Sequence, residues 1–264
     1  MITKRQIESM ESISKVLPEW PAPESIHAFV TERTGGFSGG KFASLNLAYH
    51  VDDDSRAVEC NRDLLQSSVP VNLTFQWLNQ IHSNIANIVR VPTSPIKGDS
   101  LVCRKPGIVC CVLTADCLPI FLTNTKGTEI AVIHAGWRGI CQGILANTVN
   151  EMSSHPRDLM AWLGPAIGPC HYEVGGDLKD IFRESIDSKE LWAEIEECFG
   201  LSSTAGKFFL DLYKTAAAIF RHLGITDIYG GNYCTFSDED KFYSYRRDKE
   251  TGRMVSAIFI EPGC

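Results

Sequence analysis

The sequence lacks a stretch of about 20 uncharged apolar residues, so it predicts no membrane-spanning helix. Its first twenty residues, MITKRQIESMESISKVLPEW, contain acids and lack the apolar segment of a signal peptide. No long run of one charge sign occurs, and a net charge of -7 argues against nucleic acid, because phosphate contacts need clustered Lys and Arg. We therefore expect a cytoplasmic protein whose partners are neither membranes nor nucleic acids, and the sequence leaves its oligomeric state open.

The sequence also lacks a CxxC pair, which argues against a zinc ribbon held by four protein ligands. Its ten cysteines lie mainly in apolar runs that are typical of strands, such as Cys103, Cys110, Cys111 and Cys117. Buried thiols in such runs are usually reduced. We therefore expect packing cysteines rather than a disulfide framework.

The remaining composition is that of a globular chain. Of the 264 residues, 44% are hydrophobic and 22% are charged, which is enough to bury a sizeable core. Strands and helices do not alternate strictly, which favours an α+β fold. We expect an N-terminal arm or helix over residues 1–24 and a single domain over residues 25–264. The predicted strands are 25–31, 75–79, 85–91, 107–113, 118–122, 130–134, 159–164, 225–229 and 255–260, and the predicted helices are 57–67 (with Ser55 as N-cap), 143–152, 178–199 and 210–223.

Three segments near predicted strand ends carry side chains that bind metals. His82 lies in QIHS, Cys117 in LTADCLP and His134 in VIHAGWRG. Two imidazoles and a thiolate suit zinc, and three protein ligands leave the fourth position for water or substrate. Sequence spacing does not show that the three meet, because a histidine beside an apolar strand is more often a hydrogen-bonded core residue.

Further polar residues are candidates for substrate binding. Arg138 follows a Gly-Trp turn and can clamp phosphate bidentately, or it can form a structural ion pair. Arg33, in TERTGG, is a second candidate for the same role. Asn46, in SLNL, can hydrogen-bond a base or a ribose, or it can form a turn.

Two acids, an aromatic residue and an arginine complete the candidate site. Asp99 is a candidate substrate contact that can also orient a ligand imidazole, and Asp116 is a candidate acid or base that can instead be a structural cap. Tyr172 offers a flat surface for a purine, unless it is simply core. Arg246 and its neighbour Arg247 can bind anions or remain solvated. We expect surface or capping roles for His50, His155 and His222.

Several motifs together resemble a known family. They are TERTGGFSGGKFASLNLAYHVDD, NRDLL, NQIHS, GDSLVCRKPG, LTADCLPIFL, VIHAGWRGI, LGPAIGPCHYEV and CTFSDEDKFYSYRRDKETGRM. In this combination the chain resembles the YfiH-type multicopper oxidase-like family, also called the laccase-domain, purine nucleoside phosphorylase or peptidoglycan editing factor family. The resemblance covers about residues 27–260.

The resemblance implies a fold, a metal and an activity. The implied fold is two mixed β-sheets packed face to face, with helices outside. The implied zinc ligands are His82, Cys117 and His134, and Zn2+ is expected in preference to copper. The implied reactions are the deamination of adenosine and the phosphorolysis of adenosine, guanosine or inosine, and methylthioadenosine, with inorganic phosphate as co-substrate. Cys117, His134 and Asp116 are then the candidate catalytic residues.

Three other hypotheses remain open at this point. The family fold is similar to that of a bacterial toxin cysteine hydrolase, so Cys117 could attack an amide with a histidine as base, in peptidoglycan precursor editing. Copper-dependent polyphenol oxidation is a weaker hypothesis, because laccase chemistry needs about ten histidines and the chain has seven. The three ligands could also form a structural or redox-sensing zinc site in a binding protein.

Overall fold

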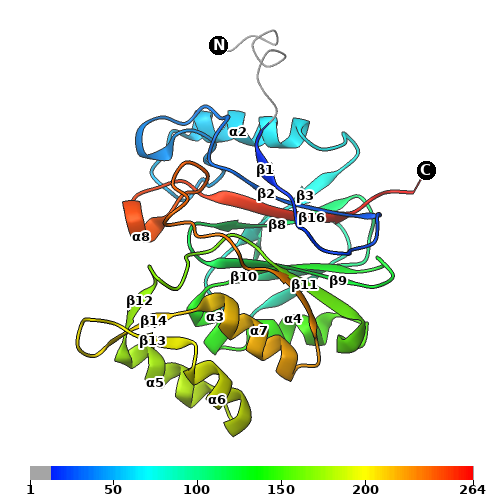
Figure 1. Ribbon diagram of the computed structural model, residues 1–264. Helices are drawn as coiled ribbons and strands as arrows, with labels where there is room; N and C mark the ends of the chain where they lie inside the picture. Colours follow the sequence, from blue (N-terminus) through cyan, green and yellow to red (C-terminus); the bar gives the residue numbers. More distant parts are fainter. Residues whose placement is uncertain (1–12, 264) are drawn as a thin grey trace.

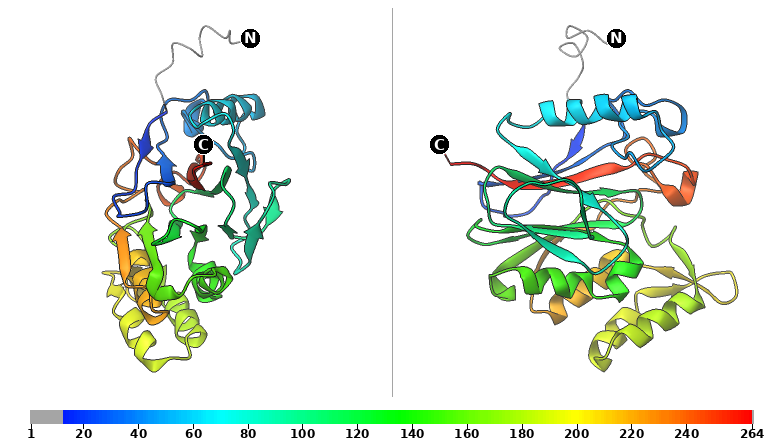
Figure 2. Two further views of the ribbon diagram at one scale, coloured as in Figure 1. Left: turned by 90° about the vertical axis from the view of Figure 1, so that its right-hand side faces the viewer. Right: turned by 180° about the vertical axis from the view of Figure 1, so that it is seen from behind.

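Two mixed β-sheets lie face to face at the centre of the structure, a computed structural model that describes residues 13–263. One long helix covers the outer face of the first sheet, and several helices cover the outer face of the second (Figure 1). The side and rear views show the same order of layers (Figure 2). This arrangement confirms the predicted fold class.

The first sheet has five strands in the order β1-β2-β16-β8-β3. Neighbouring strands are antiparallel except for β3 and β8, which run parallel. The inner strand β8 (IVCCVLT) is buried on both faces, which explains its almost entirely apolar sequence. The strands are β1 (Lys15–Val16), β2 (Ile26–Thr31), β3 (Thr74–Gln76), β8 (Ile108–Thr114) and β16 (Met254–Ile260).

The second sheet has six strands in the order β15-β11-β9-β10-β7-β5. The two edge pairs, β11 with β15 and β5 with β7, are parallel, and the inner pairs are antiparallel. The strands are β5 (Ala86–Val89), β7 (Ser100–Cys103), β9 (Leu118–Asn124), β10 (Ile130–Ala135), β11 (Leu159–Leu163) and β15 (Asp227–Gly230).

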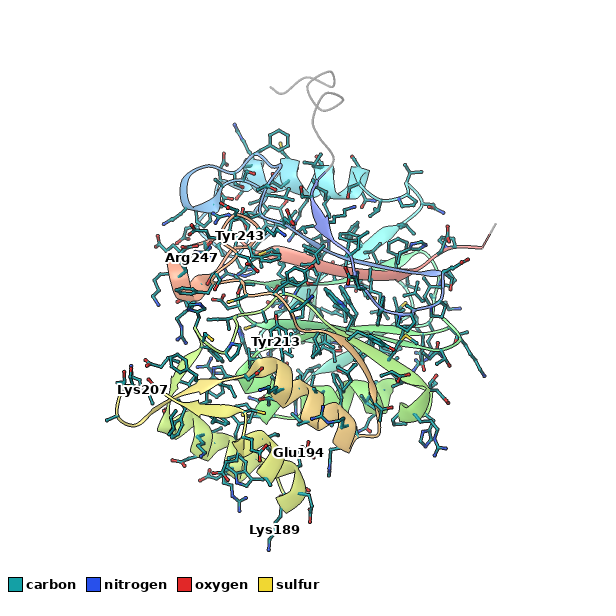
Figure 3. All side chains as sticks on the ribbon, in the orientation of Figure 1. Lys189, Glu194, Lys207, Tyr213, Tyr243 and Arg247 are labelled. Atoms are coloured by element: carbon teal, nitrogen blue, oxygen red, sulfur yellow. The ribbon has the colours of Figure 1, made fainter. Side chains whose placement is uncertain are left out.

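Helices complete the outer layers. Helix α2 (Ser55–Ser67) buries Val58 and Leu65 against the first sheet, where an apolar cluster includes Leu47, Val109 and Val255. A larger cluster joins the second sheet to its helices, and Tyr213 contributes to it from α7 (Figure 3). The other helices are α3 (Trp137–Cys141), α4 (Ile144–Glu151), α5 (Gly176–Ser185), α6 (Lys189–Glu196), α7 (Leu212–His222) and α8 (Tyr245–Asp248), with 3-10 turns η1 (Gly40–Phe42) and η2 (Pro156–Asp158).

Two small sheets lie beside the main pair. One has three strands in the order β12-β14-β13 and packs near α5, and the other pairs β4 with β6. The sequence patterns missed the three-stranded sheet and β6, because these strands are too short to show a clear period, whereas β4 falls within the strand expected over 75–79. The two small sheets comprise β4 (Leu78–Asn79), β6 (Ile96–Lys97), β12 (Glu173–Gly175), β13 (Phe199–Leu201) and β14 (Lys207–Leu210).

Some expected element boundaries were wrong. The N-cap of α2 is Asp54, whose carboxylate accepts the N–H of Arg56, and Ser55 is already helical. The single helix expected over 178–199 is two helices, because the Ser188 hydroxyl caps α6 by accepting the N–H of Leu191. The strand expected over 75–79 is divided into β3 and β4, which join different sheets.

The N-terminal prediction is only partly covered by the structure. Residues 1–12 lie outside the described part of the chain, and the arm or helix expected there stays a prediction. Lys15 and Val16 form β1, which pairs with β2 at the edge of the first sheet. The domain boundary expected at residue 25 also stays a prediction. Among residues 13–263, no helix is long and apolar enough to cross a membrane.

Candidate metal centre

The three predicted ligands converge on one point. His82 lies in the loop after β4, Cys117 in the turn that joins β8 to β9, and His134 on β10. Their ligand atoms all lie within 4.8 Å of one another, and Sγ of Cys117 is 4.0 Å from Nε2 of His82. Since β8 and β9 belong to different sheets, the turn that carries Cys117 crosses from one layer to the other.

Asp99 holds both histidines from behind. It is fully buried, and its Oδ1 lies 2.8 Å from Nδ1 of His134 and accepts the backbone N–H of His82 at 3.0 Å. Its Oδ2 accepts the backbone N–H and the hydroxyl of Ser83. Burial alone would raise the pKa of Asp99, but its hydrogen bonds with His134 and Ser83 lower it to about 2. The carboxylate therefore stays ionised and leaves Nε2 of His134 for a ligand.

The electrostatics of the cluster favour a thiolate. Burial opposes ionisation of Cys117, but the charge of His134 and hydrogen bonds from both histidines lower the pKa of the thiol to about 6. Burial likewise opposes the charged form of His134, yet Cys117 and Asp99 raise the pKa of that imidazole to about 9. The thiolate and imidazolium therefore stabilise each other in the absence of a cation.

The donor set fits a metal ion. Zinc holds sulfur at about 2.3 Å and imidazole nitrogen at about 2.0 Å, so tetrahedral ligand atoms lie roughly 3.3–3.6 Å apart. Small side-chain movements would bring the observed atoms to these separations. Glycine at 136 keeps the approach clear, because a Cβ there would lie 3.0 Å from Sγ of Cys117 and 3.2 Å from Cδ2 of His82. The residues can therefore hold a metal with three protein ligands.

A cavity of about 450 Å³ opens beside the cluster. Four long cationic side chains line it, together with a single carboxylate, Asp116, among the described residues. Aromatic, aliphatic and neutral polar groups, together with the three candidate ligands, form the rest of its surface. Apart from those ligands, the polar and aromatic lining residues are His50, Gln80, Thr114, Asp116, Trp137, Arg138, Tyr172, Tyr245, Arg246, Lys249 and Arg253.

Four of the predicted site residues outside the ligand set line this cavity: Asp116, Arg138, Tyr172 and Arg246. Asp116 lies between the predicted strands 107–113 and 118–122, in the β8–β9 turn, with a φ of 87°. Its two oxygens accept the Thr235 hydroxyl and the backbone N–H of Arg246, both at 2.6 Å. The Arg246 guanidinium lies 5.2 Å from the centre of the Tyr172 ring.

Three other candidates lie elsewhere. The amide of Asn46 is fully buried and binds Ala48, Asp53 and the backbone of Arg253, so it fixes loops rather than touching the cavity. Asp99 is behind His134 and also does not reach the cavity. Arg33 donates to the carbonyls of Ala43 and Glu239 and lies in a separate surface hollow.

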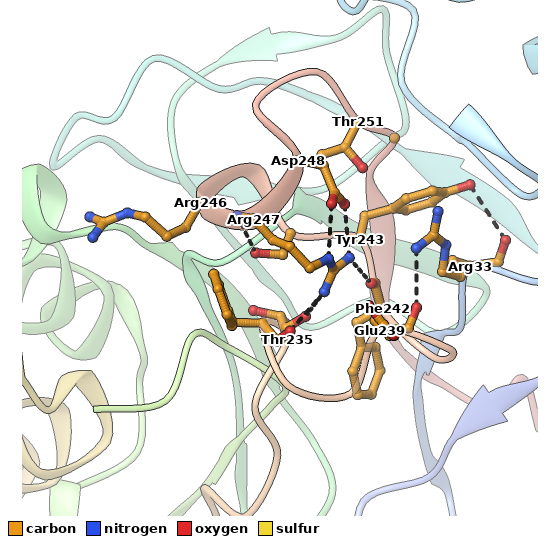
Figure 4. A network of polar contacts seen from close by, with 12 residues as sticks. Arg33, Thr235, Glu239, Phe242, Tyr243, Arg246, Arg247, Asp248 and Thr251 are labelled. Atoms are coloured by element: carbon orange, nitrogen blue, oxygen red, sulfur yellow. Dashed lines mark hydrogen bonds and ion pairs between the residues drawn. The ribbon is translucent and has the colours of Figure 1, made fainter. Parts of the chain in front are cut away.

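Figure 4 separates the adjacent pair of arginines. Arg247 donates to the carbonyls of Thr235, Phe236 and Phe242 and pairs with Asp248. These contacts indicate a structural role for Arg247. Arg246 points away from this network, toward the cavity that it lines.

The sequence patterns missed His50, Lys249 and Arg253 as cavity residues. His155 has the expected capping role, because it accepts the N–H of Arg157, but His50 lines the cavity. Burial and the neighbouring positive charges of Arg253 and Arg62 lower the pKa of His50. No local pattern marks these three residues, since the tertiary fold alone brings them to the metal cluster.

Comparisons with known proteins agree with the motifs. Residues 27–261 match the family described as "Multi-copper polyphenol oxidoreductase laccase". A Haemophilus influenzae protein named "Purine nucleoside phosphorylase" is 44% identical over 250 residues, covering 92% of this chain and 98% of its own. An Escherichia coli protein named "Purine nucleoside phosphorylase YfiH" is 39% identical over 246 residues, covering 93% and 98%.

Solved structures show the same architecture. The Neisseria meningitidis protein NMB0706 has a TM-score of 0.86 and 38% identity, with 94% of this chain and 99% of that chain covered. YlmD from Geobacillus stearothermophilus has a TM-score of 0.84 and 28% identity, with coverages of 96% and 98%. The predicted resemblance is thus confirmed over nearly the whole chain, which belongs to the laccase-like polyphenol oxidoreductase family that includes the YfiH proteins.

Proposed function

We propose that this chain is a zinc-dependent enzyme of purine nucleosides. Its reactions would be the phosphorolysis of adenosine, guanosine or inosine, and methylthioadenosine, and the deamination of adenosine. The observation that carries the proposal is the convergence of His82, Cys117 and His134 at a cavity with an excess of cations. The names of the Haemophilus and Escherichia relatives support a purine nucleoside as the substrate class.

Zinc is the metal that the donor set favours. A thiolate with two imidazoles is a borderline-soft set, which suits zinc, although copper accepts the same ligands. When bound with an open position, zinc supplies Lewis-acid polarisation and lowers the pKa of a coordinated water to about 7. Asp99 would keep His134 oriented, with Nδ1 occupied by the carboxylate.

The cavity supports a nucleoside and an anion together. Its volume of about 450 Å³ lies within the usual range for small-molecule sites. Tyr172 offers an aromatic surface for a purine, and the Arg138 guanidinium stacks on Trp137, 4.3 Å from the ring centre. No hydrogen bond holds the Arg138 guanidinium within residues 13–263, so its donors are available to phosphate oxygens.

The two reactions would use the same residues differently. In phosphorolysis, a phosphate oxygen bonds to C1′ of the ribose, the bond from C1′ to N9 breaks, and the electron pair leaves with the purine. Ribose 1-phosphate and the free base result. In deamination, water adds to C6 of adenosine and ammonia leaves, which gives inosine. Asp116 is the carboxylate on the cavity wall, and we propose that it transfers the proton in either reaction.

Product analysis tests this function. Zinc-loaded protein is incubated with adenosine, with and without phosphate, and inosine, adenine and ribose 1-phosphate are separated. We expect adenine and ribose 1-phosphate only with phosphate, and inosine in both samples. Chelation and the Cys117→Ala variant should each reduce turnover by at least about 1,000-fold, as loss of a catalytic metal does. Equal turnover without zinc would refute the proposal.

One observation favours a second candidate function. Cys117, His134 and Asp99 form a thiol–imidazole–carboxylate series, with a thiol pKa of about 6. Such a series can attack an amide, as in a cysteine hydrolase that edits peptidoglycan precursors. This function predicts amide hydrolysis without metal and trapping of Cys117 by an alkylating substrate analogue. Hydrolysis that is abolished by chelation would exclude it.

Copper-dependent phenol oxidation has less support, despite the family description. A laccase cluster needs several coppers and about ten histidines, whereas the sequence has seven. Within residues 13–263, the clustered ligands form one three-residue set. That set is sufficient for one metal ion.

A further inference from the structure

The cavity beside the metal cluster has an unbalanced charge. Arg138, Arg246, Lys249 and Arg253 line it, and none of them forms an ion pair with a carboxylate within residues 13–263. The carboxylate on the cavity wall, Asp116, is already engaged by a hydroxyl and a backbone N–H. In a protein of net charge -7, this concentration of unpaired cations indicates an anionic ligand.

Lys249 occupies an unfavourable backbone conformation. It follows α8 with φ 61 and ψ -59, and the N–H of Glu250 donates to the carbonyl of Asp248 at 2.8 Å. This hydrogen bond across one residue defines a γ-turn of the rare, strained form with positive φ. A lysine costs more free energy here than a glycine would, and such strain often occurs at functional sites.

Arg253 is fixed beside the same wall. Its backbone N–H donates to Oδ1 of Asn46, and its carbonyl accepts the N–H of Leu47. Nη1 donates to the carbonyls of Thr251 and Gly252, which leaves Nε and Nη2 without a hydrogen-bond partner in the described chain. The guanidinium is therefore immobilised with two donor atoms unused.

Tyr245 connects these two cations. Its carbonyl accepts the N–H of Lys249, and its ring centre lies 5.9 Å from the Arg253 guanidinium carbon. Arg246, by contrast, lies against Tyr172 and donates to the carbonyl of Glu173. The cavity thus has more than one cationic region, and the region at Lys249 and Arg253 combines a guanidinium held by backbone carbonyls with a lysine ammonium that has no hydrogen-bond partner within residues 13–263.

We propose that Lys249 and Arg253 form an oxyanion subsite that holds a phosphate group for the reaction beside the metal cluster. The proposal rests on the proposed nucleoside function and deepens it by assigning its phosphate-binding residues. The fixed guanidinium supplies directional donors, and the ammonium of Lys249 supplies a mobile point charge. The phosphate is either free or the ester group of a nucleotide, and the two have the same recognition chemistry.

Binding measurements test the subsite without relying on turnover. Isothermal titration of zinc-loaded protein with inorganic phosphate, and separately with adenosine 5′-monophosphate, compares wild type with Lys249→Met and Arg253→Met. We expect each variant to bind phosphate at least about 10-fold more weakly, because each loses a charge-assisted hydrogen bond. Lys241→Met is the matched control, since Lys241 is exposed and does not line the cavity.

A glycine variant separates ligand binding from folding. Lys249→Gly should bind phosphate as weakly as Lys249→Met but should have a higher melting temperature than wild type, because glycine accepts a positive φ. Lys249→Met keeps the strain and should not gain stability. A fall in melting temperature for Lys249→Gly would contradict the strained-lysine basis of the proposal.

The remaining outcomes distinguish free phosphate from a phosphate ester, and failure of the subsite from failure of the proposed function. Weaker binding of inorganic phosphate assigns the subsite to the free anion, and weaker binding of the monophosphate alone assigns it to a substrate ester. Unchanged affinity for both ligands in both variants would overturn the subsite. If phosphate binding depends on these residues but no nucleoside product forms, the subsite stands and the proposed function fails. If nucleoside products form but the variants bind phosphate with unchanged affinity, the proposed function stands and the subsite fails.

Discussion

Replacing Asp99 by asparagine would test how the metal centre is organised. The carboxylate of Asp99 contacts the side chain of one proposed ligand, His134, and the backbone of another, His82. It also accepts two hydrogen bonds from Ser83. An asparagine side chain of similar size keeps one acceptor oxygen and turns the other position into a donor. That donor would face an N–H or O–H group that now points at a carboxylate.

The magnitude follows from these contacts. Loss of a carboxylate behind a ligating histidine typically reduces metal affinity by about 10- to 100-fold, or about 1.4–2.8 kcal/mol. The effect should reach the upper part of this range, because Asp99 also fixes His82, whose φ of 57 is unfavourable for a histidine. Apo-protein stability should fall by about 1–3 kcal/mol, since a buried donor loses its acceptor.

Competition with a chromophoric chelator measures the zinc affinity, and urea unfolding in the presence of chelator measures apo-protein stability. Asp158→Asn is a suitable control, because Asp158 is exposed and distant from the cluster in the 3-10 turn η2. Zinc affinity within about twofold of wild type would refute the positioning role of Asp99.

Three further predictions concern other parts of the structure. Gly136→Ala should weaken zinc binding by at least about 10-fold in chelator competition, because its Cβ would crowd Cys117, whereas Gly39→Ala, which meets nothing within 4 Å, should bind zinc normally. Glu129→Gln should lower the free energy of unfolding by about 1–3 kcal/mol in urea at pH 7, because buried Glu129 accepts the N–H groups of Ser153 and Ser154. Burial opposes ionisation of Glu129, but these hydrogen bonds and the charge of Arg104 lower its pKa overall. The difference in the free energy of unfolding between wild type and Glu129→Gln should therefore be complete above about pH 4.5 and shrink as the pH falls through the lowered pKa. A pH-independent difference would contradict this. Tyr213→Phe should cost about 1–3 kcal/mol in the same assay, since the N–H of Ala166 loses its 2.8 Å acceptor, and an unchanged midpoint would show that another acceptor replaces it.

The inner strands of the two main sheets could be predicted, because a strand that is buried on both faces has a nearly continuous apolar sequence. The strands IVCCVLT and LPIFLTN are mostly apolar and are buried over all seven residues, and both correspond to predicted strands. The break between α5 and α6 was missed, since Ser188 interrupts a stretch that is helical in period on either side. The three-stranded sheet was missed for a different reason: Glu173–Gly175 and its partners are stabilised by pairing rather than by a local pattern.

The candidate site, too, could be predicted only in part from the sequence. The residue types at His82, Cys117 and His134 indicate a metal, but spacing does not reveal their convergence, and the family resemblance supplied that expectation. The donor geometry depends on the turn between the two sheets that carries Cys117. It also depends on the carboxylate of Asp99, which lies outside the three segments that carry the ligands. Lys249 could not be predicted either, because a positive φ at a non-glycine residue has no local signature.

The turn between β8 and β9 gives the protein a mechanical property. Because Cys117 sits where the chain steps from one sheet to the other, a cation held there would clip the two layers together. Affinity for the cation and resistance to sliding of the layers must then rise and fall together, since linkage is reciprocal. A substitution deep between the sheets, far from any ligand, would therefore be detectable as a change in metal retention.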